Sequence, residues 1–298
     1  MSTTEHLAES VAAPVVAAQG AVDSSEAFIA PPKPTFAARL AGWIRVGGPP
    51  LIVFGAIIGL WYAVHANLDG GKKVLLPTPG EVIKDGYGNA IVRQQIFDSL
   101  WQTTKVVIVG LAIAALIGVL WAIAMSLGRW IERSTYPYAV ILQTIPILAI
   151  VPLIGIWFGY EFKARVVVTV MIALFPMVSN TLFGLQSVEK SLHELFQLQN
   201  ARRGTVLVKL MFPAALPAIF VGLRTSAGLA VVGAIVGDFF FQRGTPGLGS
   251  LIQVYTRLLN TPALFAAIFV ASLLGVLVFG LFGVLSKLAV GRWYEPVK

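Results

Sequence analysis

The sequence contains no cysteine and few charged residues. Without cysteine there is no disulfide framework and no thiol chemistry. Charged residues make up 12% of the 298 positions, whereas soluble domains carry about 25%. Hydrophobic residues make up 57%, which indicates an integral membrane protein. The net charge of +8 comes from bases that flank apolar segments, so lipid head groups and membrane topology explain it better than nucleic acid does.

Residues typical of catalysis and metal binding are also scarce. His6, His65 and His193 have no second histidine or acid at metal-ligand spacing, so we expect no zinc site. No Gly-rich loop is followed by a Lys-Ser/Thr pair, so we expect no ATP site. A hydrolase would need a nucleophile beside a base, and no such pairing is evident. We predict no catalytic residue, no metal and no cofactor in this chain.

The N-terminal region differs from the rest of the chain. Residues 1–33 are rich in Ala, Ser, Val, Glu and Pro, and no basic residue precedes Lys33, so they do not resemble a signal peptide. We expect a disordered cytoplasmic tail. In residues 34–48, Phe36, Leu40 and Trp43 share one helical face, which fits a helix lying in the membrane interface. The alternative is that this segment is simply the start of the first membrane span.

Six apolar segments approach or exceed the roughly 20 residues that cross a bilayer. They predict an all-α membrane protein with one membrane domain over residues 49–290 and a cytoplasmic tail at 291–298. Pro146 and Pro152 predict a kink or break in the third segment. The predicted spans are Pro49–Val64, Thr104–Leu127, Tyr138–Phe158, Val166–Leu185, Ala214–Phe241 and Ala263–Val290.

The basic residues near the span ends predict the orientation. The span ends fall into two sets, one on each side of the membrane. The set that includes both termini and the loop 188–213 carries more Lys and Arg residues than the other set, which includes Lys163 and Arg165. We therefore expect both termini and this loop to be cytoplasmic. The opposite segments, Asn67–Ser99 and Gln242–Asn260, are too short for an enzyme domain and are candidate contact surfaces for an extracytoplasmic partner.

The loop 188–213 is the one long polar segment in the second half of the chain. Ser191 and Glu194 have the spacing of a capping box, and the residues after them predict a short helix with an apolar face. Asn200 tolerates the left-handed conformation that ends a helix. A second helix over Thr205–Phe212 would run into Pro213. This pattern predicts a docking surface.

This loop resembles the cytoplasmic Glu-Ala-Ala loop of permease subunits from ABC-type importers. The family pattern is Glu-Ala-Ala, three residues, Gly, and about a dozen residues later an apolar-Pro pair. Glu194 stands at the Glu position, Leu195 and Phe196 at the two Ala positions, Asn200 at the Gly, and Phe212-Pro213 at the closing pair. The segments LPTPGEV, ILQTIPILAIVPLIGIWFG, FPMVSNTLFGL and GLRTSAG follow in order and resemble the nitrate/sulfonate/taurine branch, which pyrimidine-precursor and riboflavin importers share.

The resemblance implies a plasma-membrane permease in which two copies form the solute path. A cytoplasmic ABC ATPase would bind ATP and dock under the loop, and an extracytoplasmic solute-binding protein would deliver the solute. A sulfonate-, nitrate- or taurine-type anion is favoured, and a pyrimidine or riboflavin-type vitamin precursor remains open. The expected ATPase-coupling residues are Ser191, Glu194, Leu195, Phe196, Leu198, Asn200, Ala201, Arg202, Arg203 and Pro213.

Two other classes of function are weighed beside this one. A secondary transporter or channel that works without an ATPase would normally show coupling carboxylates or matching broken helices, and neither is evident. An intramembrane enzyme would need a catalytic constellation.

Polar residues within the spans are candidates for the translocation path. Ser179 and Asn180 are the first choice for contact with the solute. Arg224 either attracts an anion inside the path or extends to the head groups. Asp238 either lines the outer gate or hydrogen-bonds the segment RGTPGLG that follows it.

Overall fold

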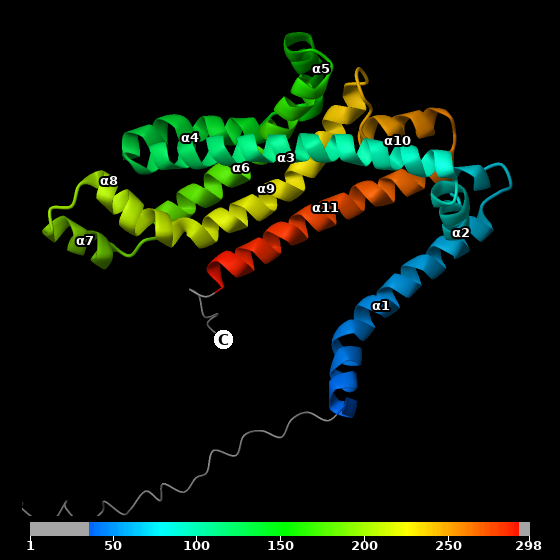
Figure 1. Ribbon diagram of the computed structural model, residues 1–298, viewed down its shortest axis with the longest axis horizontal. Helices are drawn as coiled ribbons and strands as arrows, with labels where there is room; N and C mark the ends of the chain where they lie inside the picture. The colour runs from blue at the N-terminus through cyan, green and yellow to red at the C-terminus, as the bar shows by residue number, and fades with distance from the viewer. Residues whose placement is uncertain (1–35, 292–298) are drawn as a thin grey trace, which may run out of the picture. The chain divides into compact units, whose positions relative to one another are not determined.

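A computed structural model describes the backbone of residues 36–291 and the side chains from residue 48 onward. Within these residues the chain is entirely helical (Figure 1). Of the expected tails, residues 1–33 and 291–298, all but Gly291 lie outside the described residues.

The chain divides into two units within helix α1 (Phe36–Asn67), at Ile58 and Gly59. The described part of the first unit is the beginning of α1, which continues through Pro49 and Pro50 without a break. The backbone therefore shows no boundary between residues 34–48 and the first predicted span. Membrane helices tolerate prolines because neighbouring groups satisfy the freed carbonyls. The interfacial position of residues 34–48 stays a prediction.

The second unit is built around four long helices. They are α3 (Ala90–Ser126), α6 (Phe162–Gln186), α9 (Phe212–Phe240) and α11 (Thr261–Val290). At about 1.5 Å per residue, each is longer than the roughly 30 Å of hydrocarbon in a bilayer. Together with Gly48–Asn67 they give five helices apolar and long enough to span a membrane. The corresponding predicted spans are confirmed as helices, and each helix begins before the predicted span.

The third predicted span is broken. Helix α4 (Arg129–Thr144) and helix α5 (Ile147–Phe158) meet at an angle of 99°. Pro146 occupies the N-cap position of α5 and has no N–H with which to continue the helix. The predicted break is confirmed. Because the pair forms either one broken span or a re-entrant loop, the sixth crossing stays a prediction.

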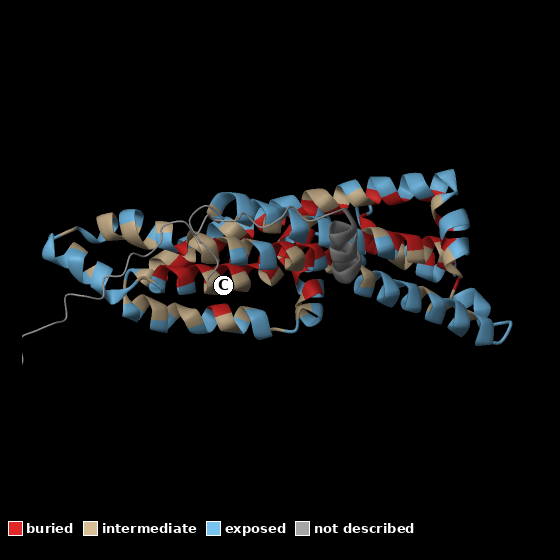
Figure 2. Cartoon of the chain, turned by 90° about the horizontal axis from the view of Figure 1, so that it is seen from below, coloured by how far each residue is buried: buried red, intermediate tan, exposed pale blue. Residues whose placement is uncertain are grey.

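Small residues let α3, α6 and α9 approach closely. A Cβ atom at Gly118 of α3 would lie 2.7 Å from Met177 Cγ of α6. A Cβ at Gly233 of α9 would lie 2.9 Å from the Cα of Thr169. Buried residues accordingly gather along the centre of the bundle, while the outer faces are exposed (Figure 2). Helices in membranes associate largely through such close backbone packing.

Short elements cap one end of the bundle. After the 3₁₀ turn η1 (Lys73–Leu75), Thr78 and Glu81 form a reciprocal capping box at the start of α2 (Pro79–Glu81). The π-helical turn η2 (Val82–Tyr87) then leads to α3. In the first turn of α3, the N–H groups of Ile91 and Val92 donate to Asn89 Oδ1.

Helix α10 (Leu248–Arg257) lies at the same end (Figure 1). It follows an irregular segment, residues 241–247.

Candidate functional site

The loop between α6 and α9 begins with helix α7 (Lys190–Leu198). Asn200 follows it with φ +50°, in the left-handed region. The N–H of Asn200 donates to the Gln197 carbonyl at 2.9 Å, and the N–H of Ala201 donates to the Phe196 carbonyl at 3.0 Å. These two bonds form a Schellman motif, which satisfies the free carbonyls at the helix end. The predicted left-handed break at Asn200 is confirmed.

The predicted capping box at Ser191 and Glu194 is wrong. The N-cap residue of α7 is Glu189, so Ser191 already lies inside the first turn. Its hydroxyl donates to the Glu189 carboxylate at 3.4 Å instead of accepting from the backbone. Glu194 is exposed on the helix surface. The rigidity of α7 therefore comes from its C-terminal motif rather than from its start.

Helix α7 contacts its own chain along one edge, where His193 and Phe196 are half-buried. His193 and Gln197 line a cavity of about 330 Å³ together with residues of α3 and of the segment that precedes α9. Three leucines lie on the other side, and their exposed fractions are 42% for Leu192, 48% for Leu195 and 82% for Leu198. No residue of α7 is buried, and Phe196 is half-buried. The apolar side of α7 is thus uncovered by the described chain.

The second helix of the loop does not end at Pro213 as predicted. Helix α8 (Arg203–Val206) continues through a π-helical turn, η3 (Leu207–Met211), directly into α9. Pro213 therefore lies inside a continuous helical segment, directly after the π-helical turn.

The remaining coupling candidates lie just before this continuous helix. Arg202 is the exposed N-cap of α8, and its carbonyl accepts from Thr205 and Val206. Ala201 is half-buried, and it lines the α7 cavity together with Arg203.

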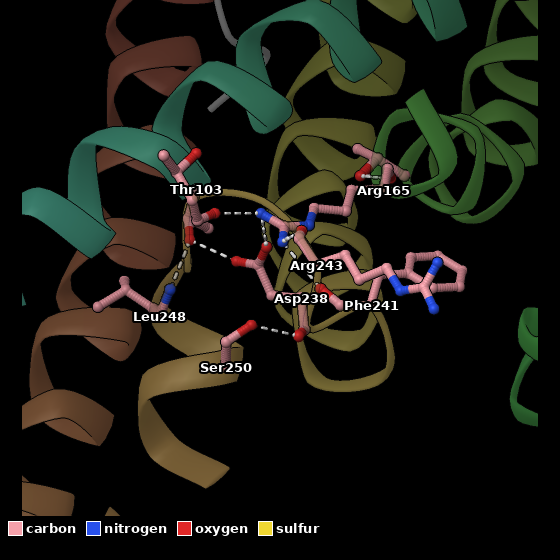
Figure 3. Close-up of polar contacts among 9 residues, drawn as sticks. Thr103, Arg165, Asp238, Phe241, Arg243, Leu248 and Ser250 are labelled. Atoms are coloured by element: carbon pink, nitrogen blue, oxygen red, sulfur yellow. Dashed lines mark hydrogen bonds and ion pairs between the residues drawn. The ribbon is translucent and has the colours of Figure 1, made fainter. Parts of the chain in front are cut away.

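A buried ion pair lies at the opposite end of the bundle (Figure 3). Arg165, in the first turn of α6, places Nη1 3.1 Å from Asp238 Oδ1 near the end of α9, with the two side chains 3% and 0% exposed. The guanidinium also donates to the carbonyls of Phe241, Arg243 and Thr245 at 2.8, 3.0 and 2.8 Å. It therefore fixes the loop that follows α9.

Thr103 of α3 completes this cluster. Its hydroxyl donates to Asp238 Oδ2 at 2.6 Å and accepts from the Leu248 N–H at 2.8 Å. The Ser250 hydroxyl donates to the Asp238 carbonyl at 2.6 Å. Gly247 packs so closely on the Asp238 carboxylate that a Cβ atom would overlap it. The cluster ties α3, α6, α9 and α10 together at one point.

One of the path candidates, Asp238, therefore has a clear place in the structure. Asp238 has no accessible surface and contacts the loop that follows it, which corresponds to the second alternative from the sequence. Arg165, counted in the sequence as a flanking base, is instead its buried partner. The sequence does contain a signal for this pair. Arg165 begins an apolar run, and Asp238 is the only acid within the fifth predicted span.

Ser179 and Asn180 are half-buried on α6. The Asn180 amide donates to the Pro176 carbonyl at 2.8 Å, and the Ser179 hydroxyl lies 3.5 Å from the same oxygen. The Asn180 side chain also packs on Gly222 of α9. Their contact with a solute stays a prediction.

Arg224 is exposed near the middle of α9. Its guanidinium carbon lies 4.1 Å from the ring centre of Phe279 on α11. The structure does not bring it near Asp238, which lies at the end of the same helix and pairs with Arg165.

An open pocket of about 510 Å³ lies between α3 and the segment around α10. Gln95, Asp98 and Trp101 line it from α3, and Thr245 and Pro246 from the loop. Just beside it, the Tyr255 hydroxyl donates to Gln95 Oε1 at 2.8 Å, and burial raises the pKa of this phenol above its usual value. Among the residues that the structure describes, no group of acids and histidines is arranged to hold a metal ion.

Comparison with known proteins identifies the family. Residues 114–290 match the model of the binding-protein-dependent transport system inner membrane component. The formylaminopyrimidine transport permease protein ThiX of Halalkalibacterium halodurans is 33% identical over 77% of this chain and 90% of its own length. The riboflavin transport system permease protein RibX of Chloroflexus aurantiacus is 36% identical over 55% of this chain and 60% of its own length.

More distant relatives include permeases for aliphatic sulfonates in Bacillus subtilis, taurine in Escherichia coli and nitrate in Leptolyngbya laminosa. They are 26%, 27% and 24% identical over 79%, 74% and 82% of this chain and 83%, 81% and 88% of their own lengths. A crystal structure of an amino acid ABC transporter with histidines superposes with a TM-score of 0.53 over 67% of this chain and 94% of that one, at 18% identity, and so supports the fold. The chain belongs to the family of binding-protein-dependent transport system inner membrane components, the permeases of ABC importers, in the branch that includes the sulfonate, taurine and nitrate permeases.

Proposed function

We propose that two copies of this chain form the membrane path of an ATP-driven importer, with a cytoplasmic ABC ATPase docked on α7. An extracytoplasmic solute-binding protein would deliver the solute at the opposite end of the bundle, where α10 and the pocket beside Asp98 lie. This arrangement requires both termini and the α7 loop to be cytoplasmic, as the basic residues of the sequence favour.

Family membership gives the framework for this proposal. The chain is a multi-pass plasma-membrane permease rather than an enzyme, and in this family a separate subunit binds ATP. The alternative of a secondary transporter without an ATPase does not fit a family described as binding-protein-dependent.

The exposed leucines of α7 are the observation that carries the proposal. An amphipathic helix normally buries its apolar side against its own chain. Helix α7 leaves most of that side uncovered, because Leu195 and Leu198 are exposed and only Phe196 is half-buried. Burying one such leucine in a partner contributes about 1.5–3 kcal/mol, so the three leucines together provide a substantial anchor. Arg202, exposed beside them, would contact an acidic rim of the partner.

The substrate class is proposed from the branch. The relatives named for sulfonates, taurine and nitrate favour a small anion, and those named for formylaminopyrimidine and riboflavin keep a vitamin or its precursor as the second candidate. Arg224 favours the anion, since it is a cation exposed within a span.

The test is co-purification of the ATPase with variants of α7. Leu198→Asn changes the most exposed leucine, so the permease is expected to insert normally but to lose the ATPase and solute-stimulated ATP hydrolysis. Lys190→Asn, a change on the polar side of the same helix, is the matched control and should retain both. If Leu198→Asn and Leu195→Asn together still capture the ATPase at the wild-type level, α7 is not the docking surface.

A further inference from the structure

Arg224 is the one charged side chain of α9 that the proposed architecture leaves unexplained. It lies 12 residues after the first residue of α9, roughly 18 Å along the helix, and 16 residues before the last. Its contact residue, Phe279, also lies well inside α11 (Thr261–Val290). Both residues therefore lie well away from the ends of helices that are long and apolar enough to span a membrane.

The side chain is held across α11 rather than extended toward a helix end. Phe279 covers one face of the guanidinium at 4.1 Å. A Cβ atom on Gly283, one turn farther along α11, would lie 3.3 Å from Arg224 Nε and 3.4 Å from Cζ. Gly283 thus leaves the space in which the guanidinium lies. Arg224 nevertheless remains exposed, as does the adjacent Thr225.

No carboxylate of the two helices is available to pair with this cation. Helix α11 contains no Asp or Glu, and the only acid of α9 is Asp238, which pairs with Arg165. Neither ion pair found among residues 48–291 includes Arg224. A second copy would present the same α9 and α11, so those helices could not supply the missing anion either. An ionisable side chain within a membrane usually faces a partner or a water-filled cavity.

From this we infer that Arg224, stacked on Phe279, is an oxyanion-binding station in the translocation path. Its ligand class is a small oxyanion such as a sulfonate, nitrate or carboxylate, because a planar guanidinium donates two parallel hydrogen bonds to two oxygens. The contact with Phe279 holds the guanidinium at this position on α11. This inference rests on the proposed function, since it places the exposed α9–α11 face in the path of the solute.

A single cysteine measures the charge and the water access of this face. The chain has no cysteine of its own, so Thr225→Cys introduces one reporter thiol beside the guanidinium. Permeabilised membranes that contain the full-length chain are treated with anionic sulfonatoethyl methanethiosulfonate or cationic trimethylammonioethyl methanethiosulfonate. The ratio of the two reaction rates is compared with the ratio for a free thiol in solution. Arg224→Gln and Arg224→Lys are then combined with Thr225→Cys.

We expect the ratio of the anionic to the cationic reaction rate to be about tenfold higher than for a free thiol. One unit charge about 6 Å away in water has this effect, because it attracts one reagent and repels the other. The Gln variant should lose this preference and the Lys variant should keep most of it. Nitrate and taurine should slow the anionic reagent only when residue 224 is basic. Correct insertion of each variant is checked by reaction of Thr225→Cys with a membrane-permeant maleimide.

Three results would overturn the inference. Reaction with the permeant maleimide alone would place Arg224 against lipid, where phosphate head groups are its anions. If Thr225→Cys reacts with no reagent in the chain that retains Arg224, then Arg224 lies in a contact that solvent does not reach. A preference that survives Arg224→Gln would assign the anion attraction to another residue. Each of these leaves the ATPase co-purification of the α7 variants unaffected, so the failure of the two proposals can be told apart.

Discussion

Replacing Asp238 by Asn removes one charge from the buried cluster and changes little of its shape. The amide can keep an oxygen toward Thr103, which donates at 2.6 Å, but its NH₂ group then faces Arg165 Nη1 across about the 3.1 Å of the present ion pair. Two donors cannot bond, and Arg165 keeps a buried charge without a counter-ion. Breaking a buried pair in this way costs about 3–5 kcal/mol. We expect the lower end, since three backbone carbonyls still accept from the guanidinium.

The ion pair itself is isolated by a double-mutant cycle. Asp238→Leu and Arg165→Met each leave one buried charge unpaired, whereas the double variant leaves none. The double variant should therefore be destabilised less than the sum of the two single variants, with a coupling free energy of about 2 kcal/mol. Asp98→Asn, an exposed acid on the same end of α3, is the control and should change stability by less than about 0.5 kcal/mol.

The assay is unfolding of the purified full-length chain in detergent, followed by tryptophan fluorescence. A loss of about 3 kcal/mol should lower the midpoint by roughly 6–12 °C. Limited proteolysis should show earlier cleavage between residues 241 and 248, because Arg165 holds this loop through three carbonyls. If Asp238→Asn unfolds within about 1 °C of the wild type, or if the two single variants add, the cluster does not stabilise the fold in the way argued here.

Two other predictions concern the α7 loop and the orientation of the chain. Asn200→Gly should retain the ATPase, whereas Asn200→Val should weaken its co-purification, since a β-branched residue at positive φ costs about 1–2 kcal/mol; equal recovery of the ATPase would show that the Schellman motif is dispensable. In intact cells, a cysteine at Ser191 should resist membrane-impermeant thiol reagents while cysteines at Gly71 and Thr245 react; labelling at Ser191 from outside would reverse the proposed orientation.

Two segments with the same sequence pattern show what local signals can and cannot predict. Thr78-Pro-Gly-Glu81 and Ser191-Leu-His-Glu194 both fit the capping-box spacing, yet only the first forms the box. Pro79 has no N–H and a fixed φ, so it marks the first helical residue and places Thr78 at the N-cap. Nothing fixes the start of α7 in this way, and the helix begins two residues before the predicted position, at Lys190. The predicted box at Ser191 therefore does not form, whereas the box at Thr78, which was not predicted, does.

The long helices could be predicted because their signal is local. Apolar runs of the required length locate α3, α6, α9 and α11, and Pro146 locates the break between α4 and α5. The pairing of Arg165 with Asp238 could not be predicted, because it depends on how α6 and α9 pack. Glycines such as Gly233 and Gly237 set that packing, and a sequence pattern does not say which helix a glycine will face.

Helix α9 links the two candidate sites through one stiff element. It is continuous with α8, so the helical segment from Arg203 to Phe240 begins at the α7 loop, carries Arg224 near its middle and Asp238 near its end. Gly222, Gly233 and Gly237 pack it closely against α6, so sliding of one helix past the other would force side chains into backbone. A displacement of the α7 loop would therefore move α9 and α6 together. This transmission requires the π-helical turn at Leu207–Met211 to stay rigid, since it lies between the α7 loop and α9.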